Sequence, residues 1–230
     1  SFNLYYRGGN MQQLYNVEEV LFKEQSEELG LGYCFLKRTI DVICSSIGII
    51  VLLPLCFLVA VLIRLESKGN PIFSQERVGK HGKRFKMYKF RSMVSNAEEL
   101  KDKLCDKNEM SGPMFKIKED PRVTKVGKFI RKTSIDELPQ LINVLKGEMS
   151  LVGPRPSLPK EVMKFEGWMM ERLSVKPGLT CYWQVSGRSD IGFVDWMRLD
   201  VKDVRDRNTW LDIWLIMKTF GVFLGDEHAR

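Results

Sequence analysis

Residues 42–63 read VICSSIGIIVLLPLCFLVAVLI, a run of 22 residues that contains no charged side chain. A straight α-helix rises about 1.5 Å per residue, so this run would be roughly 33 Å long, close to the ~30 Å hydrocarbon thickness of a bilayer. A signal peptide is disfavoured because the run begins far from residue 1 and no small-residue cleavage site follows it. The run therefore predicts a membrane-associated helix, and this decides the class of fold.

Two features of this run argue against a simple membrane span. Pro54 lies near its middle, where it removes a backbone hydrogen bond and favours a kink. Basic residues flank both ends of the run: Lys37, Arg38, Arg64 and Lys68. Because basic flanks mark the cytoplasmic side, a re-entrant helix that breaks at Pro54 and returns would keep both ends in the cytoplasm. We predict such a re-entrant helix over residues 36–66. A single span and a buried helix of a soluble protein are the alternatives.

The composition excludes several classes of protein. A hydrophobic content of 44% with 28% charged residues is not that of a mainly disordered chain, a collagen or a polytopic transporter. The net charge of +7 indicates an anionic partner, which is nucleic acid, a phosphorylated substrate or lipid headgroups. The sequence contains two histidines, which disfavours a histidine-centred triad or a multi-histidine metal site. Its five cysteines form no C-x-x-C pair and predict reduced thiols facing a cytoplasm.

Residues 64–91 carry nine Lys or Arg and two Glu directly after the apolar run. Within this segment, two strand-like patterns flank a glycine-containing turn and predict a β-hairpin. Along the second strand, Lys89 and Arg91 share a face with Phe85 and Met87. The predicted strand is therefore apolar at one end and cationic at the other, which suits a strand end that faces phosphate.

The most informative segment for chemistry is residues 129–145, which read FIRKTSIDELPQLINVL. Its apolar spacing predicts an amphipathic helix whose start carries Asp136 and Glu137. Ser134 and Glu137 fit a capping box, which is a purely structural reading. Pro139 would disturb that register, so we expect an irregular start to the helix.

The two adjacent carboxylates provide what phosphoryl transfer needs. A carboxylate can attack phosphorus or hold Mg²⁺, while nearby cations neutralise the phosphate. We therefore predict Asp136 and Glu137 as catalytic residues and as ligands of Mg²⁺. A stacking aromatic in the loops of residues 175–188 would complete a nucleotide site. The candidate phosphate- or nucleotide-binding residues are Lys89, Arg91, Arg131, Arg155, Lys176 and Arg188.

The order of these motifs resembles the bacterial sugar transferase family, the monotopic polyprenyl-phosphate phosphoglycosyl transferases. The resemblance covers residues 36–224, most of the chain. Besides the membrane segment with its internal proline, it rests on QERVG (75–79), KFRSM (89–93), DPRVT (120–124) with Gly127, RKTSIDELPQ (131–140), GPRP (153–156), KPGLT (176–180) and WQVSGR (183–188). Family members usually have glycine where Cys181 stands.

The resemblance implies transfer of a sugar 1-phosphate from a nucleoside diphosphate sugar, usually a UDP-sugar, to polyprenyl (undecaprenyl) phosphate. This is the first membrane step in the assembly of bacterial glycoconjugates such as exopolysaccharide, capsule and O-antigen. Asp136 would attack the β-phosphate, form a phosphosugar-aspartate intermediate and release UMP. Glu137 would take a proton from the lipid phosphate or support Mg²⁺. Arg131 would grip phosphate and Arg155 would border the nucleotide site.

The expected protein is α+β, predominantly helical with a small β-hairpin sheet, and monotopic in the bacterial inner membrane on its cytoplasmic face. Residues 1–35 would form an N-terminal extension, residues 36–66 the re-entrant helix, and residues 67–230 a cytoplasmic catalytic domain with interfacial amphipathic helices. We expect no nucleic-acid partner, and an oligomer is compatible with the sequence. The rival functions are a membrane-tethered basic module that binds nucleic acid or anionic lipid without catalysis, and a phosphotransferase that makes phospholipid headgroups.

Overall fold

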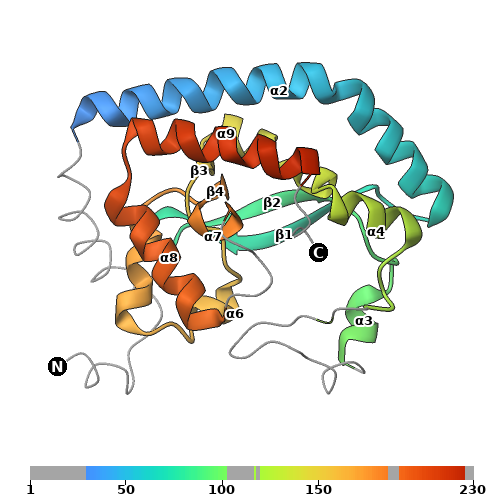
Figure 1. Ribbon diagram of the computed structural model, residues 1–230. Helices are drawn as coiled ribbons and strands as arrows, with labels where there is room; N and C mark the ends of the chain where they lie inside the picture. The colour runs from blue at the N-terminus through green and yellow to red at the C-terminus, as the bar shows by residue number, and fades with distance from the viewer. Residues whose placement is uncertain (1–29, 103–116, 118–119, 186–191, 226–230) are drawn as a thin grey trace.

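The computed structural model describes residues 30–102, 117, 120–185 and 192–225 (Figure 1). The α-helices are α2 (Leu31–Glu66), α3 (Ala97–Asp102), α4 (Lys125–Lys132), α5 (Gln140–Lys146), α6 (Pro159–Val162), α7 (Tyr182–Val185), α8 (Phe193–Asp206) and α9 (Thr209–Gly225). The strands are β1 (Ile72–Val78), β2 (Arg84–Phe90), β3 (Ser150–Val152) and β4 (Gly178–Thr180), and short 3-10 helices are η2 (Lys80–Gly82), η4 (Ile135–Glu137) and η5 (Gly167–Ser174). The prediction of a mainly helical fold with a small hairpin sheet is confirmed, and β3 and β4 add a second small sheet.

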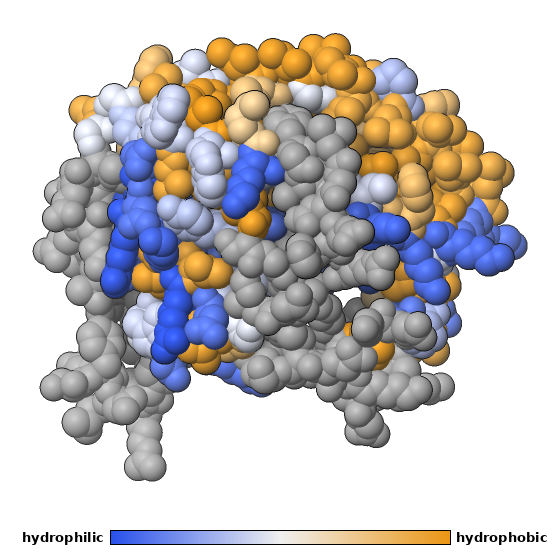
Figure 2. Space-filling view, viewed as in Figure 1, coloured by the Kyte–Doolittle hydropathy of each residue, from blue (hydrophilic) through white to orange (hydrophobic). Residues whose placement is uncertain are grey.

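Helix α2 contains the apolar run and lies along one side of the molecule, where it bends over the adjacent elements (Figure 1). It is long and apolar enough to cross a membrane. Hydrophobic residues gather over it in the space-filling view (Figure 2). The backbone stays helical through Pro54, whereas the sequence predicted a break there. A proline removes one backbone hydrogen bond, and a long helix accommodates this loss by bending. The re-entrant path in a bilayer stays a prediction.

Both ends of α2 are bonded to helices of the rest of the molecule. Near its start, the guanidinium of Arg38 donates to the carbonyl oxygens of Val144 and Leu145, each at 2.7 Å, close to the C-terminus of α5. At its end, the carboxylate of Glu66 accepts from the backbone N–H of Lys125 at 2.7 Å and from the next N–H at 3.0 Å. These bonds satisfy backbone groups that have no partner inside α5 and α4.

The hairpin forms in the predicted place. Strands β1 and β2 are antiparallel, and Phe85 and Met87 of β2 are buried against α5. The side chain of Asn143 on α5 fixes the distance between helix and strand. Its amide nitrogen donates to the carbonyl of Lys86 at 2.8 Å, and its oxygen accepts from the backbone N–H of Tyr88 at 3.0 Å. Helix α5 is therefore held against one edge of the hairpin.

Strands β3 and β4 are parallel, and the backbone at Gly178, the first residue of β4, lies unusually close to Gly153, which follows β3. A Cβ atom on Gly178 would lie 2.1 Å from the backbone nitrogen of Gly153, and one on Gly153 would lie 2.4 Å from the carbonyl oxygen of Lys176. Real Cβ atoms do not make such contacts, so both positions require glycine. This approach places the Gly153-Pro-Arg-Pro156 loop against the chain that precedes β4.

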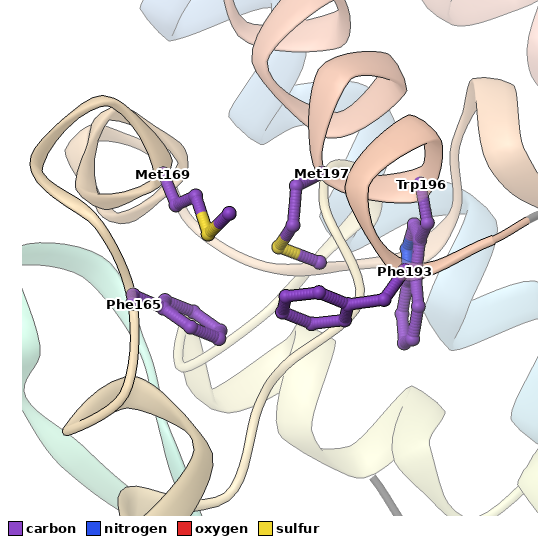
Figure 3. Close-up of a cluster of buried hydrophobic side chains, with 5 residues drawn as sticks. All are labelled: Phe165, Met169, Phe193, Trp196 and Met197. Carbon is purple, nitrogen blue, oxygen red and sulfur yellow. The ribbon is translucent and has the colours of Figure 1, made fainter. Parts of the chain in front are cut away.

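A cluster of aromatic and methionine side chains lies between η5 and α8 (Figure 3). Its buried members are Phe165, Met169, Phe193, Trp196 and Met197. The ring of Trp183 stacks on Trp196, with centroids 4.4 Å apart. Trp183 belongs to the loop in which the sequence predicted an aromatic that stacks on a nucleotide. In the structure its indole packs on another tryptophan, so this residue supports the core.

Candidate active site

Asp136 and Glu137 lie in a short irregular segment between α4 and α5. Ser134 has a left-handed backbone with φ of 52°, and the 3-10 turn η4 follows it. Helix α5 begins only at Gln140, with Pro139 as its N-cap residue. The side chain of Ser134 makes no capping hydrogen bond, so the capping-box reading is wrong and the predicted irregular start is confirmed.

Glu137 is bound by two cations from different parts of the chain. One carboxylate oxygen, Oε1, accepts from Nζ of Lys89 on β2 and from Nη2 of Arg155 in the Gly-Pro-Arg-Pro loop, each at 2.8 Å. Burial alone would raise the pKa of Glu137, but the charges of Arg155 and Lys89 outweigh it and hold that pKa well below its ordinary value. Glu137 therefore stays an anion and fixes the positions of both cations.

Asp136 differs from Glu137 in its bonding. Its carboxylate makes no hydrogen bond or ion pair with the part of the chain that the structure describes, and the residue is only 8% exposed. Burial first, and then the negative charge of Glu137, raises the pKa of Asp136, while Lys89, Arg155 and Arg131 act in the opposite direction. A buried carboxylate that is unbonded and surrounded by cations is available to react with a phosphate.

Arg131 completes the cationic side of the site from the last turn of α4. Its Nε donates to the hydroxyl of Ser92 at 2.8 Å, and its charge acts on Asp136. Helix α4 is placed by a close backbone contact, because a Cβ on Gly127 would lie 2.0 Å from the carbonyl oxygen of Ser92. Thr124 caps this helix by accepting a hydrogen bond from the backbone N–H of Gly127.

The Arg155 loop is supported by a buried arginine that the sequence analysis missed. Nη2 of Arg172, on η5, donates to the carbonyl oxygen of Arg155 at 2.5 Å and to Oδ2 of Asp200 at 2.6 Å. Arg172 also donates to the hydroxyl of Ser157. The side chains of Arg172 and Asp200 are 1% and 0% exposed. No sequence motif marks this pair, since its members are 28 residues apart and lie within apolar patterns.

A second arginine from the hairpin also contacts this loop. Nη1 of Arg77, on β1, donates to the carbonyl oxygen of Pro156 at 3.1 Å. Burial and the neighbouring charge of Arg155 lower the pKa of Arg77 to about 10, so its guanidinium stays charged near neutrality. In the sequence, Arg77 stands out only as part of the QERVG motif. Arg77 lies on β1, which pairs with β2, the strand of Lys89, and this predicted pairing could have identified Arg77 as a residue near the site.

Two of the predicted anion-binding residues, Arg91 and Lys176, are not brought to Asp136. Arg91 donates to the carbonyl oxygens of Ser67 and Lys68, at 2.6 and 2.8 Å, and so caps the end of α2. Lys176 lines a separate pocket beside the start of α2. Arg188 lies outside the described residues.

The carboxylates of Asp136 and Glu137 fit a magnesium ion only if a substrate supplies further ligands. The described residues contain no cluster of three or more His, Cys, Asp or Glu side chains. Within the described residues, the side-chain hydrogen bonds to Glu137 both go to Oε1, so its other oxygen, Oε2, could act as a metal ligand. Magnesium is usually bound by one or two carboxylates together with substrate phosphates, and this donor set matches that pattern.

A family model described as bacterial sugar transferase matches residues 32–226 of the chain. The chain belongs to the bacterial sugar transferase family. The match includes every predicted site residue and all of α2 from Gly32 onward. The family resemblance inferred from the motifs is thereby confirmed.

Three relatives are similar to this bacterial sugar transferase over most of the chain. It is 48% identical over 198 residues to a galactosyl transferase, CpsE, of Streptococcus agalactiae, which covers 84% of this chain and 43% of the relative. It is 41% identical over 225 residues to an undecaprenyl-phosphate galactose phosphotransferase of Salmonella typhimurium, covering 96% of this chain and 47% of the relative. An exopolysaccharide production protein, ExoY, of Rhizobium meliloti is 35% identical over 187 residues, or 80% of this chain and 83% of ExoY. The chain thus spans about half the length of the first two relatives.

Proposed function

We propose that the protein transfers a sugar 1-phosphate from a UDP-sugar to undecaprenyl phosphate, with Asp136 as the nucleophile. The observation that carries this proposal is the buried carboxylate of Asp136, which makes no hydrogen bond with the described residues and lies next to a glutamate that holds Lys89 and Arg155. The name of the Salmonella typhimurium relative, an undecaprenyl-phosphate galactose phosphotransferase, supports undecaprenyl phosphate as the acceptor. Exopolysaccharide or capsule assembly is the corresponding process.

The proposed reaction has two displacements at one phosphorus atom. An oxygen of Asp136 attacks the β-phosphorus of the UDP-sugar and forms an O–P bond. The bond from this phosphorus to the oxygen that bridges the two phosphates breaks, and UMP leaves with the electron pair. An oxygen of undecaprenyl phosphate then attacks the same phosphorus, the bond to Asp136 breaks, and the carboxylate is restored. Covalent catalysis of this kind divides one difficult step into two easier ones.

Glu137 acts in this proposal by positioning cations. Because its pKa is held well below the ordinary value, it is a poor acceptor for a proton from the lipid phosphate. Lys89 and Arg155 stand where negative charge develops on the transferred phosphoryl group, and Arg131 adds a third positive charge. Mg²⁺, held by the carboxylates of Asp136 and Glu137, supplies further neutralisation of the diphosphate when bound.

The proposed location of the reaction is the cytoplasmic face of the bacterial inner membrane. The exposed apolar side chains of α2 support this location, since water would otherwise cover them (Figure 2). Basic residues at both ends of the apolar run favour the re-entrant path, which keeps both ends of α2 on one side.

The test is UMP release by the purified protein in detergent, with Mg²⁺, undecaprenyl phosphate and a panel of UDP-sugars. We expect release with at least one UDP-sugar, together with incorporation of its sugar phosphate into lipid. Intact-mass analysis without the acceptor lipid should show an adduct equal to the sugar phosphate. Protein that is folded, binds lipid and turns over no UDP-sugar would contradict the proposal and favour a binding module without catalysis.

The pH dependence of turnover should reflect the raised pKa of Asp136. The nucleophile works as the carboxylate, so kcat/KM should fall on the acid side at a higher pH than an ordinary aspartate would give. Replacing Glu137 by glutamine removes a neighbouring negative charge and frees two cations, and both changes lower the pKa of Asp136. The acid limb of the Glu137→Gln profile should therefore move to lower pH. The control Glu99→Gln, at an exposed residue, should leave the acid side of the pH profile unchanged. If the acid side also stays unchanged in Glu137→Gln, the titrating group is not Asp136.

A further inference from the structure

A pocket of about 200 Å³ lies beside the first turns of α2, apart from the candidate active site. Its described lining contains five basic residues and three aspartates. The lining includes neither of the paired acids, Asp136 and Glu137, nor the cations Lys89, Arg131 and Arg155. The basic residues come from α2, from the hairpin turn, from the chain before β4 and from the end of α8: Lys37, Arg38, Lys80, Lys176 and Arg207.

Two of the three aspartates already have partners. Asp41 accepts from the hydroxyl of Ser150 at 3.0 Å and from the following backbone N–H at 2.9 Å. Asp212 accepts from the hydroxyl of Tyr33 and is paired with Nζ of Lys37, each at 3.0 Å. Asp41 therefore joins α2 to β3 and Asp212 joins α9 to α2, and within the described residues neither forms an ion pair with Lys80, Lys176 or Arg207.

The third aspartate, Asp203, adds little negative charge near neutrality. It is buried close to Asp200, and burial followed by the charge of Asp200 raises its pKa to about 7. A substantial fraction of this side chain is therefore protonated at pH 7. The pocket then has an excess of positive charge.

Three cations of the pocket, Lys80, Lys176 and Arg207, make no ion pair and no side-chain hydrogen bond within the described ranges. Nη1 of Arg207 is buried and has no hydrogen-bond partner among the described residues. Burial lowers the pKa of Lys80 and of Lys176, and neighbouring cations, Arg207 for the former and Arg38 for the latter, lower it further. A buried donor without an acceptor is costly, so this arrangement calls for an anion.

The position of the pocket indicates which kind of molecule carries that anion. Tyr33, Lys37 and Arg38 line it from the turns of α2 that directly precede the apolar run, and Phe35 and Leu36 on the same turns are exposed. With α2 in a bilayer, as proposed above, these turns lie at the level of the lipid headgroups. We propose that the pocket binds the phosphate group of an anionic membrane lipid, held by Lys80, Lys176 and Arg207. Such a lipid would anchor the start of α2 to the catalytic domain.

The test compares lipid binding by matched charge variants in detergent. Short-chain phosphatidylglycerol is titrated into the protein, and retained adducts are counted by native mass spectrometry. The double variant Lys80→Gln/Arg207→Gln should lose about tenfold or more in apparent affinity, because two charge-assisted hydrogen bonds are removed. The control Lys83→Gln/Arg198→Gln removes the same charge from exposed positions outside the pocket and should bind as the wild type does. Equal losses in both variants would overturn the proposal in favour of non-specific attraction.

Two further measurements identify which phosphate compound occupies the pocket, and a third distinguishes failure of this inference from failure of the proposed function. Inorganic phosphate that displaces phosphatidylglycerol at equal concentration would overturn the lipid assignment and leave a site for a free anion. A tenfold rise in the KM for undecaprenyl phosphate in the double variant would overturn it in favour of the acceptor lipid. Sugar transfer by the wild type is measured separately. A protein that binds phosphatidylglycerol in the pocket but transfers no sugar would contradict the proposed function and leave this inference standing.

Discussion

Replacing Asp136 by asparagine should lower UMP release and lipid-linked product by about 10³-fold or more. The amide keeps the size of the side chain and the position of η4, but it cannot form the bond to phosphorus. The covalent adduct seen without acceptor lipid should vanish at the same time. Because Asp136 makes no hydrogen bond within the described residues, the variant should fold and bind lipid as the wild type does.

The matched control is Asp195→Asn, which removes the same charge from an exposed aspartate of α8. It should retain the turnover of the wild type. An Asp136→Asn protein that still forms the adduct would exclude Asp136 as the nucleophile. Loss of the adduct in Glu137→Gln alone would exchange the roles proposed for the two acids.

Replacing Arg172 by leucine should lower the free energy of unfolding by about 3–5 kcal/mol, because it leaves Asp200 buried without its partner. Burial raises the pKa of Asp200 to about 6 even with Arg172 present, so the lone aspartate would take up a proton or admit water. The change also removes the hydrogen bond to the carbonyl oxygen of Arg155. We therefore expect lower thermal stability and, in the folded fraction, a lower kcat.

Thermal unfolding in detergent measures the first effect, and two comparisons define its cause. The double variant Arg172→Leu/Asp200→Leu should recover part of the lost stability, since no charge is then left buried. Arg205→Leu breaks a pair with Glu171 in which the arginine is 66% exposed, and it should cost no more than about 1 kcal/mol. Similar losses for Arg172→Leu and Arg205→Leu would contradict the role given to the buried pair.

The features that could be predicted from the sequence depend on local patterns. The hairpin follows from alternating residues around a turn, and the irregular start of α5 follows from Pro139. Arg91 is a residue for which such a local pattern gives the wrong position. Strand alternation predicts that it shares a face with Lys89, but β2 ends at Phe90. Beyond that point the strand geometry no longer applies, and Arg91 turns to the end of α2.

The contacts that could not be predicted join segments far apart in the chain. Lys89 and Glu137 are 48 residues apart and meet because the side chain of Asn143 sets α5 against β2. Arg172 and Asp200 meet because η5 packs on α8. The path of α2 at Pro54 depends on how well the surrounding turns absorb one missing hydrogen bond, and sequence alone does not state this balance.

The two bonded ends of α2 give that helix a use beyond attachment. Arg38 is bonded to the last carbonyls of α5 and Glu66 to the first amides of α4, and η4 with Asp136 lies between those two helices. With α2 in the bilayer, as proposed, the depth of this helix would therefore set the height of Asp136 above the hydrocarbon. In the proposed reaction the acceptor phosphate is confined to the headgroup layer, so α2 would set the level at which a water-soluble donor meets a membrane-bound acceptor.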